Sequence, residues 1–142
     1  MPLLAVDHLT VTLPTALGRV AALRALSFSL ERGGTLGLVG ESGCGKSMTA
    51  LALMGLLPEG AEVSGSITFQ GQELVNLADE RYAALRGDRI GMAFQEPMTA
   101  LNPVHTIAAQ IGESLRLHRG LSGAAARAEA LRLLERVQLP RA

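Results

Sequence analysis

Apolar and polar positions alternate along two stretches near the N-terminus, with the two-residue period of a strand that has one face on a core. Residues 3–13 and residues 25–30 carry this pattern. Residues 14–19 lie between them and begin with a proline, which is typical of a turn or loop. The first part of the chain is therefore expected to hold two strands, each with one buried face.

Two short runs are apolar without alternation, which is typical of strands buried on both faces of a sheet. They are residues 35–39, which follow the chain-breaking pair Gly33-Gly34, and residues 89–94, which directly precede Gln95. Residues 64–71 predict a further strand that ends in a tight turn. We therefore expect a mixture of alternating and fully buried strands.

An apolar helix is predicted from about residue 46 to residue 57, directly after a glycine-rich loop. Pro58 lies in the segment that stops it. The longest apolar stretch, residues 48–57, is shorter than the roughly 20 residues that a membrane-spanning helix needs. The N-terminus also lacks the basic and apolar pattern of a signal peptide.

Three more helices follow from the pattern. A short helix over residues 79–86 is expected to be capped by Asp79 and closed by Gly87. Two amphipathic helices then close the sequence, and Gly120 ends the first of them. Their apolar faces carry Ile107, Ile111 and Leu115 in the first helix, and Ala126, Ala130, Leu133, Leu134 and Val137 in the second.

Composition limits the classes of protein that remain. The sequence has 142 residues, of which 48% are hydrophobic and 18% charged, so it suffices for one packed domain and is too short for two ordinary ones. Thirteen basic residues balance thirteen acidic ones and only 3% are aromatic, which argues against nucleic-acid binding through a general basic field or through aromatic stacking and leaves a local basic patch open. The single cysteine, Cys44, excludes an internal disulfide framework and fits a reducing compartment.

The sixteen glycines become informative in one segment, Gly40-Glu41-Ser42-Gly43-Cys44-Gly45-Lys46-Ser47. It matches the phosphate-loop pattern G-x-x-x-x-G-K-[ST] and lies between a predicted strand and a predicted helix, which is the context that the motif requires. Glycines let successive backbone N–H groups turn toward phosphate oxygens, and the helix N-terminus adds partial positive charge. All eight residues are therefore candidates for binding a nucleotide.

Two side chains of this loop have specific expected roles. Lys46 would neutralise the β- and γ-phosphates, and Ser47 would supply a hydroxyl ligand to Mg²⁺. The alternative is an ordinary glycine-rich turn, and the agreement of strand, loop, lysine, serine and helix favours the phosphate site. Cys44 is either a small residue that the loop tolerates, which we favour, or a reactive thiol near a helix N-terminus.

A second segment narrows the class of phosphate-loop protein: Phe94-Gln95-Glu96-Pro97-Met98-Thr99-Ala100-Leu101-Asn102-Pro103. Together with residues 39–47 it resembles the ATP-binding subunits of ABC transporters, and specifically of the dipeptide, oligopeptide and nickel importers. The resemblance extends across the whole chain and includes residues 26–30 and residues 65–69. It implies an α/β phosphate-loop NTPase core with an antiparallel β-region, truncated before the signature and Walker B motifs.

By this resemblance Gln95 is the Q-loop glutamine, which reaches Mg²⁺ and the attacking water. A neutral amide offers an oxygen to the metal and an N–H to the water, and the alternative is a polar residue that ends a strand. The implied catalytic residues are thus Lys46 and Gln95, and the implied metal ligands are Ser47 and Gln95. The resemblance divides the chain into residues 1–95, the nucleotide-binding core, and residues 96–142, the start of an incomplete helical subdomain.

The sequence departs from the family pattern in two ways. Leu17 stands where family members usually place an aromatic side chain on adenine, so base recognition is expected to be weaker or merely apolar. The LSGGQ signature, the Walker B aspartate with its catalytic glutamate, the D-loop and the switch histidine are not found. Residues 121–123 imitate the signature, but alanines follow them, so Ser122 is interpreted as a helix N-cap.

The resemblance implies the N-terminal portion of a subunit that couples ATP binding and hydrolysis to the uptake of peptides or nickel. Its cofactors would be ATP and Mg²⁺. Its partners would be transmembrane permease subunits and a second ATP-binding subunit, with no nucleic acid, and it would lie peripherally on the cytoplasmic face of the inner membrane. The choice of cargo stays open, as does turnover of ATP by this chain.

Two other functions also stay open. The missing catalytic glutamate favours a nucleotide-binding or regulatory fragment without turnover. A small phosphate-loop kinase would need an arginine-rich lid and an acceptor pocket, and the segment around Gln95 argues against it. If the chain hydrolyses ATP and Lys46→Ala abolishes this turnover, the binding-only fragment is excluded. Phosphoryl transfer to a small acceptor would indicate the kinase.

Overall fold

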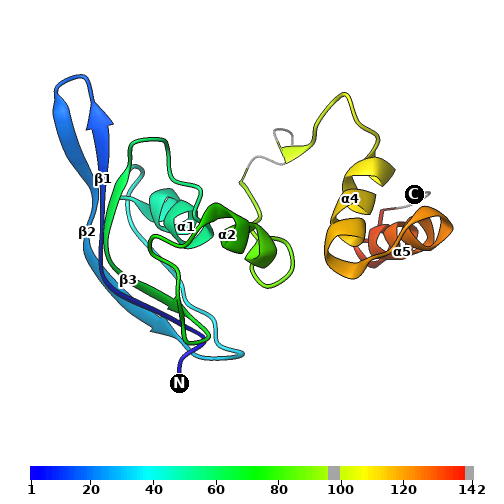
Figure 1. Ribbon diagram of the computed structural model, residues 1–142, viewed down its shortest axis with the longest axis horizontal. Coiled ribbons are helices and arrows are strands. Elements are labelled where there is room, and N and C mark those ends of the chain that lie inside the picture. Colours follow the sequence, from blue (N-terminus) through cyan, green and yellow to red (C-terminus); the bar gives the residue numbers. More distant parts are fainter. Residues whose placement is uncertain (96–99, 140–142) are drawn as a thin grey trace. The chain divides into compact units, whose positions relative to one another are not determined.

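The computed structural model describes residues 1–95 and 100–139 (Figure 1). It divides into two units, Met1–Arg86 and Gly87–Ala142, and each is described by itself. This division follows the contacts within the chain. The division expected after Gln95 separates a nucleotide-binding core from a helical subdomain by their roles, and it stays a prediction.

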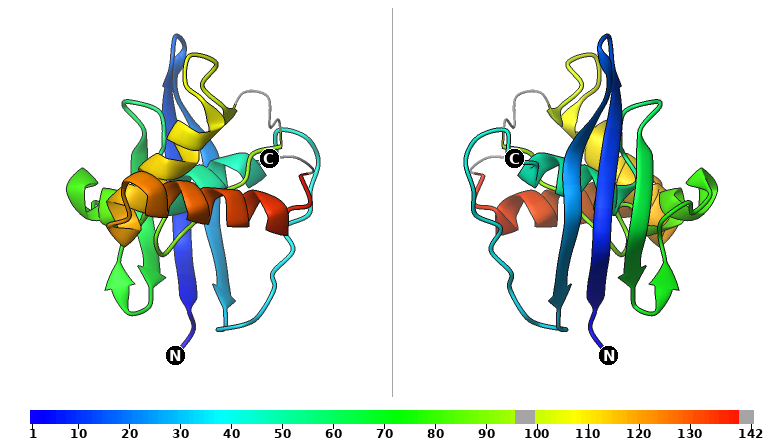
Figure 2. Two further views of the ribbon diagram at one scale, coloured as in Figure 1. Left: turned by 90° about the vertical axis from the view of Figure 1, so that its right-hand side faces the viewer. Right: turned by 90° about the vertical axis from the view of Figure 1, so that its left-hand side faces the viewer.

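A four-stranded antiparallel sheet forms the framework of the first unit, with the strand order β2-β1-β3-β4. The strands are β1 (Leu4–Thr15), β2 (Gly18–Leu30), β3 (Glu62–Phe69) and β4 (Gln72–Glu73). The two alternating stretches and the segment at residues 64–71 are thus confirmed as strands. The turn predicted over residues 14–19 is shorter in the structure, because only residues 16–17 form it and the strands continue on both sides. In the right-hand view of Figure 2 the strands lie in front of α1 (Lys46–Met54). The buried side chains of the sheet are Val6, Leu9, Val11, Leu23, Ile67 and Phe69.

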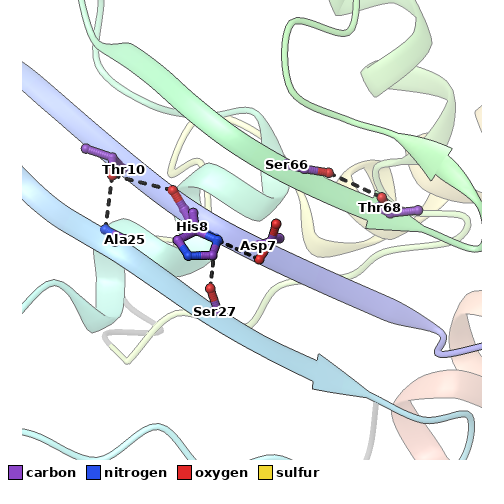
Figure 3. A network of polar contacts seen from close by, with 7 residues as sticks. All are labelled: Asp7, His8, Thr10, Ala25, Ser27, Ser66 and Thr68. Carbon is purple, nitrogen blue, oxygen red and sulfur yellow. Dashed lines mark hydrogen bonds and ion pairs between the residues drawn. The ribbon is translucent and has the colours of Figure 1, made fainter.

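Strand β1 contains a bulge at His8, where its register shifts against both β2 and β3. His8 and Ala25 both adopt a left-handed φ of 48°. The N–H of His8 donates to Oγ of Ser27 at 2.8 Å, and the N–H of Ala25 donates to Oγ1 of Thr10 at 3.0 Å (Figure 3). Side-chain hydroxyls therefore accept hydrogen bonds from these two irregular backbone positions.

Gly65 of β3 meets this bulge from the neighbouring strand. Its φ is +93°, and a Cβ at this position would lie 2.5 Å from the carbonyl oxygen of His8 and 2.6 Å from that of Asp7. Both the backbone conformation and the approach of backbone atoms therefore require glycine.

Helix α1 ends three residues earlier than the apolar pattern predicted. Gly55 follows it in a left-handed conformation, with φ 62°, and closes the helix through hydrogen bonds to its last carbonyls. Arg86 caps the same end, because its Nε donates to the oxygen of Met54 and its Nη2 to the oxygen of Gly55, both at 2.8 Å. The helix therefore ends at a combined glycine and arginine cap.

Helix α2 (Asp79–Leu85) confirms the short helix, but its cap differs from the prediction. Asp79 is the first helical residue, Ala78 holds the capping position, and no side chain caps the N-terminus. The carboxylate of Asp79 accepts a hydrogen bond from Nη1 of Arg86 at 3.0 Å instead. Asp79 therefore joins the start of α2 to the arginine that caps α1.

The two runs predicted as buried strands are not strands in the structure. Residues 35–39 belong to no helix, turn or ladder, and Val39 is 98% exposed. Residues 89–94 are likewise irregular apart from a single bridge at Ile90, and Phe94 is exposed. A strand buried on both faces needs hydrogen-bonding neighbours on both sides, and the described residues pair no strand with either run. The prediction of two buried strands is therefore wrong for this chain.

In the described part of the second unit, the two predicted amphipathic helices are confirmed as α4 (Ile107–Arg119) and α5 (Gly123–Arg136). Oγ1 of Thr106 caps α4 by accepting from the N–H of Ala109 at 3.2 Å, and Gly120 closes the helix in a left-handed conformation. Ser122 holds the N-cap position of α5, as predicted, but its side chain makes no capping hydrogen bond. No helix among the residues described here is long and apolar enough to cross a lipid bilayer.

Candidate nucleotide-binding site

The glycine-rich loop connects residues 35–39 to the first turn of α1. Gly43 and Gly45 adopt φ values of +82° and +96°, which side chains with a Cβ rarely adopt. The N–H of Cys44 donates to the oxygen of Glu41 at 3.3 Å, which closes a turn inside the loop. The loop therefore has the tight curvature that the sequence motif predicts.

Lys46 binds back onto its own loop. Its Nζ lies 2.6 Å from the carbonyl oxygen of Gly40, 2.6 Å from that of Glu41 and 3.3 Å from Sγ of Cys44. An ammonium has three N–H donors, so each of these three acceptors can receive one of them. The side chain is therefore held across the loop rather than extended into solvent. Lys46 is also the single lysine of the 142-residue sequence.

Gly45 links the loop to both the helix and the sheet. It is the N-cap of α1, and its carbonyl oxygen accepts from the N–H of Thr49 at 2.8 Å and from Oγ1 of Thr49 at 3.0 Å. A Cβ on Gly45 would lie 2.5 Å from Cδ2 of Leu23 and 2.9 Å from the oxygen of Ala22, both in β2. Strand β2 therefore supports the loop where the helix begins.

The motif pattern did not identify Thr49 and Leu23 as neighbours of the site. Both are buried, with exposed fractions of 2% and 6%. A hydroxyl residue four positions after the last loop glycine, inside an apolar helix, is the signal that could have pointed to Thr49. No local signal marks Leu23, because its contact with Gly45 depends on how β2 packs against the loop.

A cavity of about 360 Å³ lies between β2 and the loop. Residues 21–24 of β2 line one side, and residues 38–39 and residues 43–46 line the other, with Thr49 at the start of the helix. Apolar and backbone groups make up most of these walls, and Arg24 and Lys46 contribute the charged side chains. The contact between Gly45 and Leu23 is therefore flanked by open space.

The remaining predicted residues are accessible. Glu41, Ser42, Cys44 and Ser47 are exposed, and Ser47 follows Lys46 in the first turn of α1. Leu17 lies at the tip of the β1–β2 hairpin and is fully exposed. Its position leaves the apolar side chain free to contact a flat ligand group.

Gln95 belongs to the second unit, where it lies in an exposed bend. All residues of the phosphate loop therefore lie in the first unit, and contact between Gln95 and that loop stays a prediction. Residues 96–99 of the same motif lie outside the described residues. Ala100 to Pro103 follow this gap with one helical residue and irregular backbone.

The donor set of the loop fits a nucleotide phosphate with its magnesium ion. Backbone N–H groups at a helix N-terminus and one ammonium suit phosphate oxygens, and the hydroxyl of Ser47 suits an ion that arrives with the phosphate. Among the described residues no three His, Cys, Asp or Glu side chains form a cluster that could hold a metal. The residues present thus match the group that the loop motif implies.

Comparison with known proteins decides the family. The sequence profile described as ABC transporter matches residues 23–142. The chain belongs to the ABC transporter family. The oligopeptide transport ATP-binding protein OppD of Salmonella typhimurium is 49% identical over 140 residues, which are 99% of this chain and 42% of that protein. The dipeptide transport ATP-binding protein DppD of Bacillus subtilis is 47% identical over 139 residues, which are 96% of this chain and 42% of that protein.

The ABC fold is also found among solved structures. A dimeric, post-hydrolysis state of the ATP-binding cassette MJ0796 bound to ADP and Pi matches with a TM-score of 0.83 at 24% identity, over 97% of this chain and 58% of that one. The fold predicted from the sequence, an ABC nucleotide-binding domain with its antiparallel β-region, is therefore confirmed. The chain spans about 42% of the length of the curated relatives it matches.

Proposed function

We propose that the chain binds MgATP as the N-terminal portion of the ATP-binding subunit of an ABC importer. The observation that carries the proposal is the phosphate loop, in which Lys46 is already held over the loop by the carbonyl oxygens of Gly40 and Glu41. An ammonium held in place before a ligand arrives loses little conformational freedom on binding. The loop is thus organised for a polyphosphate.

The three acceptors of the Lys46 ammonium differ in strength. Two are carbonyl oxygens at 2.6 Å, and the third is Sγ of Cys44 at 3.3 Å. A thiol sulfur is a weak acceptor, whereas a phosphate oxygen is charged and strong. A bound phosphate would therefore replace Cys44 as the third acceptor while Gly40 and Glu41 continue to hold the side chain.

Other residues have narrower proposed roles. Ser47 would give its hydroxyl to the Mg²⁺ that accompanies the phosphates, and the backbone N–H groups of the loop would bind phosphate oxygens. Gln95 would orient the attacking water and sense the γ-phosphate. Leu17 would make an apolar contact with the base from the hairpin tip, where its side chain is fully exposed. When bound, Mg²⁺ supplies charge neutralisation to the phosphates.

The importer role rests on the family and on the names of the relatives. These relatives are named for oligopeptide and dipeptide transport, so we propose peptides rather than nickel as the cargo. The partners would be transmembrane permease subunits and a second ATP-binding subunit, at the cytoplasmic face of the inner membrane. Residues 1–95 would hold the nucleotide, and residues 96–142 would begin the helical subdomain that contacts the permease.

Titration of the 142-residue chain with MgATP and with MgADP tests the proposal. We expect saturable binding by the wild-type chain and a loss of at least about tenfold in affinity for Lys46→Ala, because charge-assisted hydrogen bonds contribute roughly 1.5–3 kcal/mol. Equal affinity of the two proteins would contradict the proposal. An assay of phosphate release by the same samples separates binding with turnover from binding alone.

A further inference from the structure

The side chain of Thr49 points back to the loop from inside α1. Its residue is 2% exposed, and Oγ1 lies 3.0 Å from the carbonyl oxygen of Gly45, one helical turn earlier. The same oxygen accepts the backbone N–H of Thr49 at 2.8 Å. The carbonyl of Gly45 is thus held by two donors from a single residue.

Fixing that oxygen also fixes a donor on the other side of the same peptide bond. The peptide between Gly45 and Lys46 is planar and trans, so the C=O of Gly45 and the N–H of Lys46 point in opposite directions. The carbonyl points along the helix toward Thr49, and the N–H of Lys46 therefore points away from the helix body. This N–H is one of the free donors of the first turn, which are the groups that bind anions at helix N-termini.

The sheet restricts the same peptide from its other end. Cδ2 of Leu23 and the oxygen of Ala22 lie against the α-carbon of Gly45, at 2.5 Å and 2.9 Å from the place of a Cβ. Gly45 has a φ of +96°, a conformation that packing must hold in place if it is to persist. The peptide is therefore confined between β2 and the Thr49 side chain.

We propose that Thr49 is a positioning residue of the phosphate site. Its hydroxyl holds the carbonyl of Gly45 and thereby aims the N–H of Lys46 at a phosphate of the nucleotide. This inference rests on the proposed function, because it assumes that the loop binds a nucleotide. Thr49 itself touches no ligand in this role and acts through the backbone of Gly45 and Lys46.

Two substitutions separate positioning from packing. Thr49→Val keeps the branched shape of the side chain and removes the hydroxyl, whereas Thr49→Ser keeps the hydroxyl and removes a buried methyl group. If Thr49 positions the loop, Thr49→Val should bind MgADP about 5- to 10-fold more weakly with little change in Tm, since one well-placed hydrogen bond is worth roughly 1–1.5 kcal/mol. Thr49→Ser should lower the Tm through the lost packing and keep the wild-type affinity within about twofold.

A spectroscopic measurement reports on the N–H itself. In amide NMR spectra, saturation with MgADP should move the Lys46 amide proton downfield in the wild-type chain and in Thr49→Ser, and less in Thr49→Val. Thr10→Val is the matched control, because it removes a β1 hydroxyl that accepts the backbone N–H of Ala25 in β2, away from the phosphate loop. This control should leave both the affinity and the Lys46 amide shift as in the wild-type chain.

Each outcome has a definite meaning. Equal affinity of Thr49→Val and wild type, or equal losses for the valine and serine variants, would overturn the positioning role while the proposed function stands. No saturable MgADP binding by the wild-type chain would overturn the proposed function and this inference together. Weaker binding by Thr49→Val alone, with its smaller amide shift, would support the inference.

Discussion

Nζ of Lys46 lies 2.6 Å from the carbonyl oxygen of Gly40, so the last and first parts of the phosphate loop are joined by one side chain. This contact joins residues six positions apart in a glycine-rich segment that has few other hydrogen bonds to hold its curvature. Lys46 therefore holds the loop closed, and under the proposed function it would also neutralise phosphate when a nucleotide binds.

Amine labelling should report directly on the site. Lys46 is the single lysine in the sequence, so an amine-reactive reagent modifies only this side chain and the α-amino group of Met1. With MgATP at about ten times its dissociation constant, we expect labelling of Lys46 to slow about tenfold, because only the free fraction reacts. Peptide mass spectrometry measures both sites, and Met1 serves as the internal control. Unchanged labelling of Lys46 would contradict nucleotide binding at this loop.

Alkylation of Cys44 should block nucleotide binding. The thiol is exposed and lies 3.3 Å from Nζ of Lys46, so an added group would crowd the ammonium and the loop. We expect MgATP to slow the reaction with a small alkylating reagent and alkylated protein to lose MgATP affinity. Cys44→Ala, treated with the same reagent, should keep its affinity. Equal labelling rates with and without nucleotide would refute the prediction.

Two glycines of the sheet offer a matched pair of substitutions. Gly65→Ala forces a Cβ to within 2.5 Å of the backbone oxygen of His8, whereas Gly71→Ala meets no atom within 4 Å, and both residues have positive φ values, +93° and +83°. We expect Gly71→Ala to cost about 1 kcal/mol of unfolding free energy and Gly65→Ala about 3 kcal/mol or more. Urea denaturation measures both. Similar costs would show that strand β1 can move away from Gly65.

Glu73 should make the stability of the first unit depend on pH. Burial opposes ionisation of its carboxyl, but hydrogen bonds from Ser66 Oγ and from the N–H groups of Ile67, Val75 and Leu74 outweigh burial and lower its pKa. A carboxyl with a folded-state pKa below its unfolded value stabilises the fold above the unfolded pKa, near 4.3. That contribution disappears as pH falls through the folded pKa.

The corresponding variant is Glu73→Gln. The wild-type chain should exceed it in unfolding free energy at pH 7, and the difference should shrink progressively below about pH 5. Urea denaturation at several pH values measures this. Glu59→Gln makes the same chemical change in an exposed loop and serves as the control. A difference between wild type and Glu73→Gln that grows toward low pH would contradict the assignment.

Arg86 should contribute stability that lysine cannot replace. Its guanidinium binds the oxygens of Met54 and Gly55 and the carboxylate of Asp79, and it lies 5.2 Å from the centre of the Tyr82 ring. An ammonium cannot reproduce this planar set of contacts. We expect Arg86→Lys to cost about 1–2 kcal/mol in thermal or urea unfolding, and the exposed Arg81→Lys to cost almost nothing. Equal stability of the two variants would show that the cap is unimportant.

Local signals were enough to predict much of this chain. Alternation located β1 and β2, Gly120 located the end of α4, and the loop motif located Gly45 and Lys46, because each of these depends on residues close in sequence. The phosphate loop was predicted for the same reason, since its curvature and its lysine are encoded in eight consecutive residues.

Features that depend on distant neighbours were not predicted. Residues 35–39 have the apolar run of a buried strand, yet a strand also needs partners, and the described residues give them none. The support of Gly45 by Leu23 and the capping of α1 by Arg86 join residues 22 and 32 positions apart. Such contacts arise from packing, on which a local pattern carries no information.

The bulge at His8 divides β1 into two segments of opposite phase. Val6 is buried before it and Leu9 and Val11 after it, so the inward positions change from even to odd numbers at this residue. A one-residue deletion at His8 would therefore remove the bulge and place Val6, Leu9 and Val11 in one uninterrupted alternation, whereas a deletion elsewhere in either segment would turn the inward side chains beyond it outward. The alignment of β1 in distant relatives should accordingly be judged in two pieces, each with its own frame, rather than as one continuous strand.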